Sequence, residues 1–314
     1  MQEKLVSLCY IDVIEDKSYA DGQHPLEIIK KYGGQATVTD LCILLGCQYL
    51  ESPKIKPENN DDILKYRRGI YWTNNFDIYK QNVYVIDNNG KLTKAPITAD
   101  YCSIRPVVKS DDIYYNALFK AGLYSDEVEY GEYPQYAADL AIQKILNDKY
   151  SQNKLNKTEK RYTLNLINYY EYPEQKNSQL SCEEYEYQGE KYIKLQARFG
   201  NYYDYYTKKG ILSNGVLYKN GDDVWIKVEP VIWLINSKNH YLISKKCLVS
   251  GIRFNNNARY ARVEFEDTEL YRYLNEYMFP ELSLKEPLNI NQKSKKNKKT
   301  KTLKLSLKDP KKTK

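Results

Sequence analysis

The pattern of apolar and polar positions predicts four helices, and the clearest lies near the end of the chain. Its apolar residues recur at i, i+3, i+4, i+7 and i+8, which is helical spacing; they are Leu270, Tyr273, Leu274, Tyr277 and Met278. Asp267 or Thr268 can cap this helix, and Pro280 is expected to end it. The other helices are predicted over residues 24–34, 39–46 and 137–150, with a buried strand as the alternative for the short apolar run at 39–46.

Alternating apolar and polar residues predict antiparallel strands in two parts of the chain. Residues 70–108 alternate in period two, and the run Asp87–Gly90 supplies a hairpin turn. Residues 104–108 close this block as a strand in which Pro106 favours an edge or terminal position. Later in the chain we predict a strand followed by a turn and then two hairpins, over residues 128–135, 185–195 and 224–244.

Helices that are segregated from antiparallel strands indicate an α+β fold. Residues 109–127 form a mostly polar link with one apolar stretch, and they are the best candidate for a domain boundary. We therefore predict a small α+β module over residues 1–112 that ends in hairpin strands, a second α+β module over residues 113–284, and a disordered basic tail over residues 285–314.

The formal net charge of +7 comes from the tail. Residues 285–314 hold twelve lysines against Glu286 and Asp309, which leaves a net charge of −3 for residues 1–284. A tail without aromatic residues cannot bury enough apolar surface to order itself. Because a folded nucleic-acid-binding domain usually carries its basic residues on one face, the body does not suggest groove recognition. Tethering to nucleic acid through non-specific contacts of the lysine tail is the alternative function.

Motifs of common enzymes are absent from the sequence. The glycines form no GxGxxG, GxxxxGK[ST] or GxSxG pattern, and His24 and His240 are the only histidines. Six cysteines are expected to be free thiols, because the N-terminus lacks a secretory apolar segment and the pair Cys42 and Cys47 has no histidine to complete a zinc site. No apolar run approaches the roughly 20 residues that cross a bilayer. We expect a cytoplasmic protein without membrane association, cofactor or metal.

Six short segments resemble a large group of uncharacterised bacterial domains of unknown function. They are VEYGEYPQ (128–135), KVEPVIWLINSKNHYLISKKCL (227–248), LYRYLNEYM (270–278), RRGIYWTNN (67–75), VYVIDNNGK (83–91) and SIRPVV (103–108). Those domains are similar to the C-type-lectin-like fold shared by formylglycine-generating enzyme and by the target proteins of diversity-generating retroelements. The resemblance implies ligand display on a rigid α+β scaffold.

The sequence departs from that family at its chemical motifs. Cys102 has no partner cysteine within its block, so the oxidase activity of the formylglycine enzyme is unsupported. The calcium signatures of lectins, EPN or QPD with WND, are replaced by EPV at 229–231 and WTN at 72–74. We therefore expect a non-catalytic protein that binds a protein or another macromolecule. The rival enzyme hypothesis would rest on Cys102 or His240.

The resemblance places the binding surface on the polar hairpin after Trp72. Asparagine offers both a donor and an acceptor, and tyrosine adds contact area, which suits a recognition surface. The alternative is that Trp72 belongs to the core and the asparagines only form turns. The candidate ligand-binding residues are Trp72, Asn74, Asn75, Asp77, Tyr79, Asn82, Tyr84 and Asn88.

Overall fold

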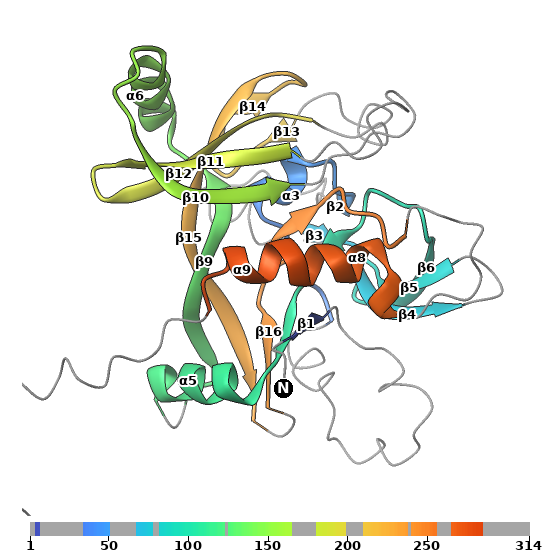
Figure 1. The fold of residues 1–314 in the computed structure, drawn as a ribbon. Helices are drawn as coiled ribbons and strands as arrows, with labels where there is room; N and C mark the ends of the chain where they lie inside the picture. The colour runs from blue at the N-terminus through green and yellow to red at the C-terminus, as the bar shows by residue number, and fades with distance from the viewer. Residues whose placement is uncertain are drawn as a thin grey trace, which may run out of the picture. The chain divides into compact units, whose positions relative to one another are not determined.

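The computed structural model describes nine stretches of the chain, all within one compact unit, residues 1–284. They are residues 4–6, 34–50, 67–77, 82–122, 125–164, 180–198, 210–237, 240–255 and 265–284. Apart from Gly34, the helix expected over residues 24–34 lies outside them, and so does the expected tail. The described elements are mostly antiparallel strands with a few short helices, which confirms the α+β class (Figure 1).

Eight described strands form the larger sheet, which is built around one long strand. They are β1 (Lys4–Val6), β8 (Val107–Lys109), β16 (Tyr241–Ser244), β15 (Asp223–Asn236), β12 (Glu190–Gln196), β11 (Leu180–Tyr187), β10 (Asn156–Leu164) and β9 (Glu127–Ala137). The first seven are neighbours in that order, and β9 also pairs with β15. β15 pairs with β12 through its first half and with β16 through its second. Because β8 pairs with β16, strands from both sides of residue 112 share this sheet.

The pairing of β9 with β15 corrects the turn expected within residues 128–135, which belong to one continuous strand. The register of this pair shifts between Lys227 and Val228 and again between Pro230 and Ile232. A proline inside a sheet is tolerated at such a bulge because it has no N–H for the ladder. The Gln135 side-chain amide donates to the carbonyl oxygens of Glu229 and Pro230 at 3.1 and 2.9 Å. It therefore provides partners where the ladder is irregular.

The smaller sheet contains the predicted hairpin. Its strands are β17 (Val249–Ser250), β7 (Ser103–Ile104), β4 (Tyr71–Asp77), β5 (Asn82–Ile86) and β6 (Leu92–Pro96), in that order, and only β4 and β7 are parallel. The predicted turn between β5 and β6 is confirmed: Asp87 Oδ1 accepts hydrogen bonds from the backbone nitrogens of Asn89 and Lys91 at 2.9 and 2.8 Å. The described residues add two short pairs, β2 (Tyr49–Leu50) with β3 (Arg68–Gly69) and β13 (Gly210–Ile211) with β14 (Leu217–Tyr218).

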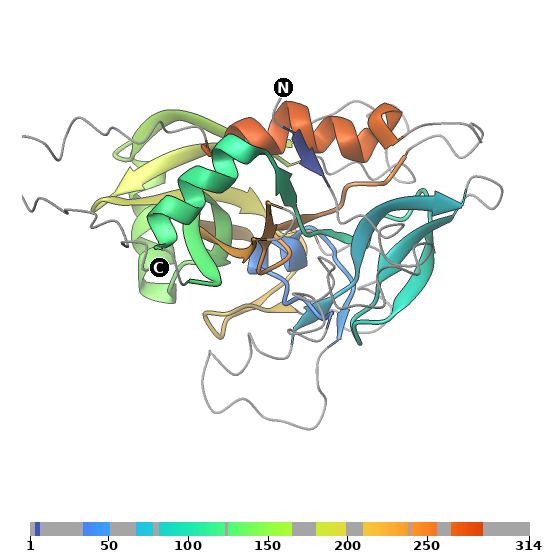
Figure 2. The same ribbon diagram turned by 90° about the horizontal axis from the view of Figure 1, so that it is seen from below.

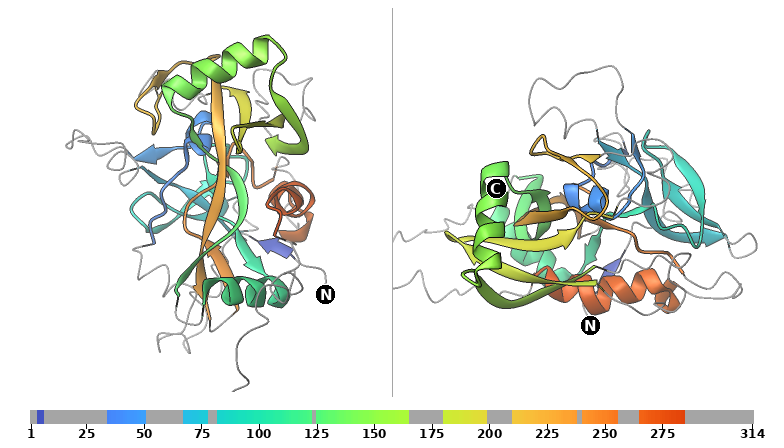
Figure 3. Two further views of the ribbon diagram at one scale, coloured as in Figure 1. Left: turned by 90° about the vertical axis from the view of Figure 1, so that its left-hand side faces the viewer. Right: turned by 90° about the horizontal axis from the view of Figure 1, so that it is seen from above.

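Two described helices pack at opposite ends of the β9–β15 pair (Figure 3). They are α5 (Asp111–Ala121) and α6 (Leu140–Ser151). α6 confirms the helix predicted over residues 137–150, whereas α5 corrects the expected polar link. Ser110 caps α5 by accepting from the backbone nitrogen of Ile113 at 3.5 Å, and only Ile113, Tyr114 and Ala117 are buried along it. Other large apolar residues of α5, such as Tyr115 and Phe119, are exposed, so its apolar positions form no single stripe that would have predicted the helix.

A third helix, α3 (Asp40–Leu44), is fully buried between the two sheets, and it was predicted over residues 39–46. The predicted cap is confirmed, because Thr39 Oγ1 accepts from the backbone nitrogen of Cys42 at 3.3 Å. α3 contacts β9 of the larger sheet and β17 of the smaller one, and Figure 2 shows it between them in blue. The main hydrophobic core is continuous through both sheets, and a smaller cluster around Trp225 lies beneath α6.

The C-terminal helix has a π-helical centre that the sequence did not predict. It follows the 3₁₀ turn η3 (Phe265–Asp267) and consists of α8 (Glu269–Arg272), the π-helix η4 (Tyr273–Met278) and α9 (Phe279–Glu281). Thr268 caps it as predicted, accepting from the backbone nitrogen of Tyr271 at 3.1 Å. The helix does not end at Pro280, because that residue falls in the first turn of α9, where its missing N–H is not needed. Within the described ranges, no helix combines the length and the apolar character needed to span a membrane.

Candidate functional site

Trp72, the central residue of the predicted binding hairpin, belongs to the core. Its side chain is fully buried, and its indole nitrogen donates to the carbonyl oxygen of Ile252 at 3.0 Å. The ring packs against Phe254, with 5.8 Å between the ring centroids. Trp72 therefore packs in the core beneath the smaller sheet and is not a surface contact residue. The sequence left this core position open as the alternative.

A bulge in β4 shapes the surface next to Trp72. Trp72 pairs with Val85 and Phe76 pairs with Val83, so three residues of β4 lie opposite Tyr84 alone. Thr73 Oγ1 closes the irregular ladder by donating to the Tyr84 carbonyl oxygen at 2.6 Å. Asn74, a predicted ligand-binding residue, is half-buried in this bulge, and its Oδ1 has no hydrogen-bond partner among the described residues. Bulges of this kind often re-aim side chains at functional sites.

The outer face of the β5–β6 hairpin brings two of the predicted residues together. Asn82 pairs with Pro96 and Tyr84 pairs with Lys94, whereas Val83 and Val85 face the core. Asn82 and Tyr84 are half-buried and Lys94 is exposed. The Lys94 ammonium nitrogen lies 4.7 Å from the centre of the Tyr84 ring, within cation–π range. We call Asn82, Tyr84 and Lys94 the hairpin face.

Most of the remaining predicted ligand-binding residues have side chains outside the described part of the structure. Asn88 is half-buried in the β5–β6 turn, where its Oδ1 accepts from Asn89 Nδ2 at 3.2 Å. Asn75 and Asp77 contribute their backbone to β4, and their side chains lie outside the described part of the structure. Tyr79 also lies outside it. The structure therefore brings Asn82 and Tyr84 onto one face and places Asn88 at its end.

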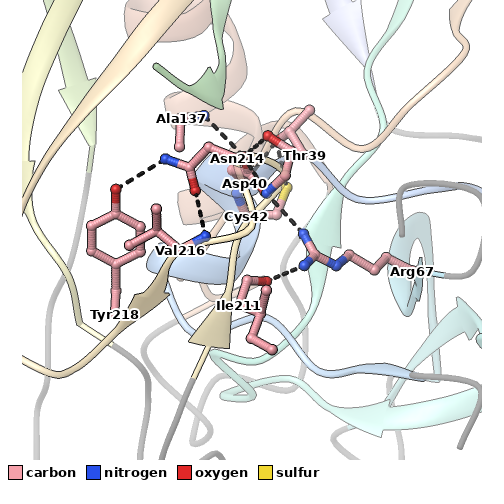
Figure 4. Close-up of polar contacts among 10 residues, drawn as sticks. Thr39, Asp40, Cys42, Arg67, Ala137, Ile211, Asn214, Val216 and Tyr218 are labelled. Carbon is pink, nitrogen blue, oxygen red and sulfur yellow. Dashed lines mark hydrogen bonds and ion pairs between the residues drawn. The ribbon is translucent and has the colours of Figure 1, made fainter. Parts of the chain in front are cut away.

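A buried carboxylate, Asp40, lies at the start of α3 where four segments meet (Figure 4). Its Oδ1 accepts from Arg67 Nη1 at 3.0 Å, and its Oδ2 accepts from the Ala137 backbone nitrogen at 2.9 Å and from the Ser213 hydroxyl at 2.5 Å. These partners are all donors, as an ionised carboxylate requires. Asp40 therefore joins α3 to the residue before β3, to the end of β9 and to the β13–β14 turn.

The ion pair between Asp40 and Arg67 is isolated from solvent, since the two side chains are 0% and 2% exposed. Burial raises the pKa of Asp40, while the Arg67 charge and the bonds from Ser213 and Ala137 lower it. Arg67 also donates through Nη2 to the carbonyl oxygen of Ile211, and its buried Nε has no partner among the described residues. Because both ions are desolvated, this pair fixes where the segments meet and is poorly suited to exchange a proton with solvent.

Burial makes the thiols near α3 poor nucleophiles. Cys42, Cys47, Cys102 and Cys247 are fully buried and free, as is expected for the reduced state. Burial raises the pKa of Cys42 to about 12 and that of Cys102 well above its ordinary value. Because the thiolate is the nucleophilic form, Cys102 is a poor candidate for the catalytic residue of the rival hypothesis.

Lys246, in the segment between β16 and β17, forms no ion pair with any of the residues that the structure describes. Lys246 is half-buried, and its Nζ lies 4.5 Å from the centre of the Tyr136 ring. Burial lowers the pKa of Lys246, against the opposing charge of Glu229. Burial also raises the pKa of Glu229 and, together with the charges of Asp40 and Glu229, that of Tyr136. The Tyr136 hydroxyl is buried and, within the described residues, makes no hydrogen bond.

A second group of titratable side chains lies where α9 meets β10. Glu281 Oε1 accepts from the Thr163 backbone nitrogen at 2.7 Å, and its buried Oε2 lacks a partner in the described part of the chain. Burial raises the pKa of Glu281 to about 8. Tyr273 of η4 donates to the Thr163 carbonyl oxygen at 3.0 Å, and its hydroxyl lies 3.2 Å from that of Tyr133. Glu281 is therefore held in a tyrosine-lined environment that favours its neutral form.

His240 lies in the turn between β15 and β16. It adopts φ 54° after β15, and its Nδ1 lies 3.3 Å from Asp111 Oδ1 at the start of α5. Its ring stacks on Tyr114 with 4.8 Å between centroids. These contacts explain its position as a link between the turn and α5. Nothing in them supplies a nucleophile.

The sequence did not predict that the titratable side chains of Asp40, Lys246 and Glu281 are removed from solvent. Asp40 was considered only as a helix cap, although its partner Ser213 is 173 residues away. Lys246 lies in an ordinary pair of lysines, and Glu281 follows the proline that was expected to end the helix. Only burial distinguishes these residues from exposed ones, and short-range patterns carry little information about burial of a single polar side chain.

The chain matches no protein-family model, no curated protein and no solved structure. Among the residues that the structure describes, no group of three or more histidine, cysteine, aspartate or glutamate side chains is arranged to hold a metal ion. A functional assignment therefore rests on the geometry of the hairpin face and of the buried polar residues described above.

Proposed function

We propose that the protein is a non-catalytic binding protein that recognises a protein or another macromolecule through the hairpin face. The observation that carries this proposal is the cross-strand pair of Tyr84 and Lys94. A lysine ammonium over a tyrosine ring presents an aromatic surface and a positive charge together. Asn82, on the same strand and the same side, adds donor and acceptor capacity beside them.

The hairpin face rests on buried core residues and lies at the edge of its sheet. The core residues buried beneath this face are Trp72, Val83 and Val85. Because they hold its backbone in place, binding a partner costs little conformational entropy there. β6 is the last described strand of its sheet, and Thr93, Lys94 and Pro96 are exposed along it. A partner can therefore approach both the face and the edge. Pro96 and Lys94 would discourage indiscriminate strand pairing at that edge.

The resemblance to C-type-lectin-like domains belongs to the same proposal, since such domains display ligands on a rigid α+β scaffold. Cytoplasmic location is also part of it. The described cysteines Cys42, Cys47, Cys102, Cys182 and Cys247 are all free and buried, a state that reducing compartments maintain. Fractionation of cells that express the tagged full chain tests this location directly.

The experiment is a comparison of partners captured from native lysate by four purified proteins. They are the full chain, residues 1–284, the full chain with Tyr84→Ala and Lys94→Glu, and the full chain with Lys144→Glu. Lys144 is exposed on α6, away from the smaller sheet, and matches the charge change at Lys94. We expect one defined partner that residues 1–284 and Lys144→Glu retain and the hairpin variant loses.

Two results would overturn this proposal. If the hairpin variant captures the same partner as the wild type, the hairpin face is not the recognition surface. If only nucleic acid is captured, with loss on removal of residues 285–314 and a steep decrease with salt, then the lysine tail is the functional element.

A further inference from the structure

The outer side of α5 carries two large apolar side chains that no described residue covers. Phe119 is 77% exposed and Tyr115 is 52% exposed, more than any other large apolar side chain of the described residues. Figure 2, which views the molecule from below, shows α5 in front of the strands on which it packs. Large apolar side chains that gather on one face are typical of interaction sites.

The helix is held in place before any partner binds. Its inner side buries Ile113, Tyr114 and Ala117. The Tyr115 ring lies edge-on to the rings of Tyr114 and His240, with 5.4 and 5.3 Å between centroids. His240 in turn stacks on Tyr114 at the β15–β16 turn. Because these contacts fix the exposed ring of Tyr115, covering it costs little conformational entropy.

The exposed side of α5 carries opposite charges at its two ends. Asp112, Tyr115, Asn116, Phe119 and Lys120 recur at i, i+3, i+4, i+7 and i+8, so they share one side of the helix. Asp112 and Lys120 are both exposed, and neither forms an ion pair with any residue that the structure describes. We call these five residues the α5 face.

These charges are complementary to those of a second, antiparallel α5. Asn116 lies midway between Asp112 and Lys120 in the sequence. With a two-fold axis at Asn116, Asp112 of each copy therefore faces Lys120 of the other, which gives two equivalent ion pairs. A parallel arrangement would instead bring like charges together, which is unfavourable. The two Asn116 amides can donate to and accept from each other across the axis.

From this arrangement we propose that the α5 face is a homodimer interface, in which two α5 helices pack antiparallel about a two-fold axis near Asn116. Phe119 and Tyr115 of each copy are then covered by the other copy. This inference goes beyond recognition by the hairpin face and does not depend on it, because the hairpin face belongs to the smaller sheet and α5 packs on β8 and β9 of the larger one.

The charges of α5 favour a second copy over other occupants. Asp111 and Asp112 are exposed at the start of the helix, where they would repel the phosphates of nucleic acid or of an anionic membrane. An unrelated protein would require no match between the two ends of α5 itself. One short helix covers less than the roughly 1,600 Å² of a standard interface, so the dimer should be reversible and depend on protein concentration.

Sedimentation velocity of the full chain over a wide concentration range tests this proposal. We expect the weight-average mass to rise from that of one chain toward that of two. Phe119→Ser should abolish this rise, since it removes the most exposed apolar side chain of the α5 face. The matched control is Ile145→Ser, which removes an apolar side chain that is exposed in the middle of α6 and should leave the rise unchanged.

Charge exchange between two variants tests the antiparallel arrangement. Asp112→Lys and Lys120→Asp each leave a copy with like charges at both ends of the α5 face, so each variant alone should remain monomeric. Mixed together they should form a heterodimer, because every substituted charge then faces an opposite one. A fluorescent label on one variant follows its sedimentation as the other is added. Loss of helix stability cannot produce this recovery, although charges at helix ends also act on the helix dipole.

Three results would overturn the proposal. The first is a full chain that sediments as a monomer at every concentration. The second is a dimer that Phe119→Ser leaves intact, since another surface would then hold the copies together. The third is a mixture of Asp112→Lys and Lys120→Asp that stays as monomeric as each variant alone, which would exclude the antiparallel pairing.

Discussion

Arg67 Nη1 donates to Asp40 Oδ1 at 3.0 Å, and the side chains of both residues are almost completely buried. The pair lies where α3, the end of β9 and the β13–β14 turn converge, since Asp40 also binds Ala137 and Ser213. Removal of one partner would leave the other as an uncompensated buried charge. The free-energy cost of burying that unpaired charge sets how strongly the protein is destabilised when the ion pair is broken.

Arg67→Met should therefore lower the free energy of unfolding by about 3–5 kcal/mol, the range for breaking a buried ion pair from one side. Chemical denaturation monitored by tryptophan fluorescence measures it. The matched control is Arg272→Met, which removes an exposed i,i+4 pair with Glu276 and should cost less than about 0.5 kcal/mol. Equal effects of the two substitutions would contradict a structural role for the buried pair.

The raised pKa of Glu281 predicts that the stability of the protein decreases as the pH rises. Burial raises its pKa from 4.5 to about 8 in the folded protein, so the folded state binds a proton that the unfolded state has released. Its favourable contribution is fully present below pH 4.5 and is lost as the pH rises to about 8. The loss is at most about 1.4 kcal/mol per pH unit.

Glu281→Gln isolates this contribution, because the amide oxygen can still accept from the Thr163 nitrogen. The difference in unfolding free energy between the variant and the wild type should grow in favour of the variant from pH 4.5 upward and become constant above about pH 8. A difference that does not change with pH would show that Glu281 titrates normally in the folded protein.

Truncation of Trp72 should cost much more stability than truncation of Tyr84. Trp72→Ala removes a fully buried side chain and its hydrogen bond to Ile252, so it should cost about 3–5 kcal/mol of stability. Tyr84→Ala alters the half-buried hairpin face and should cost less than about 1 kcal/mol. Thermal unfolding of both variants measures this. A large loss with Tyr84→Ala would mean that this residue is structural and not available for recognition.

The sequence predicted the elements whose signals are local. The β5–β6 turn was readable because Asp87 and Gly90 provide its side-chain acceptor and its positive φ of 78°. The start of the C-terminal helix was readable because Thr268 precedes an apolar stripe. α5 was not, because its apolar residues lie on its exposed side as well as on the side that packs against β9, with Tyr115 and Phe119 exposed.

The candidate sites depend on contacts that no local pattern encodes. Whether Trp72 faced solvent or core was undecidable from alternation alone, since a strand within a layered structure can be buried on both faces. Lys245 and Lys246 are identical in type and adjacent, yet Glu127 neutralises only the first. The difference arises from β9 residues more than 100 positions earlier in the chain.

The most direct test of the recognition claim is photo-crosslinking in living cells with a photoreactive amino acid at one of two positions. Position 96 replaces Pro96, which is exposed on β6 opposite Asn82 of the hairpin face, and position 144 replaces Lys144 on α6. We predict one discrete crosslinked partner from position 96, lost when Tyr84→Ala and Lys94→Glu are added, and none shared with position 144. The same crosslinks from both positions, or none from position 96, would contradict the proposed binding face.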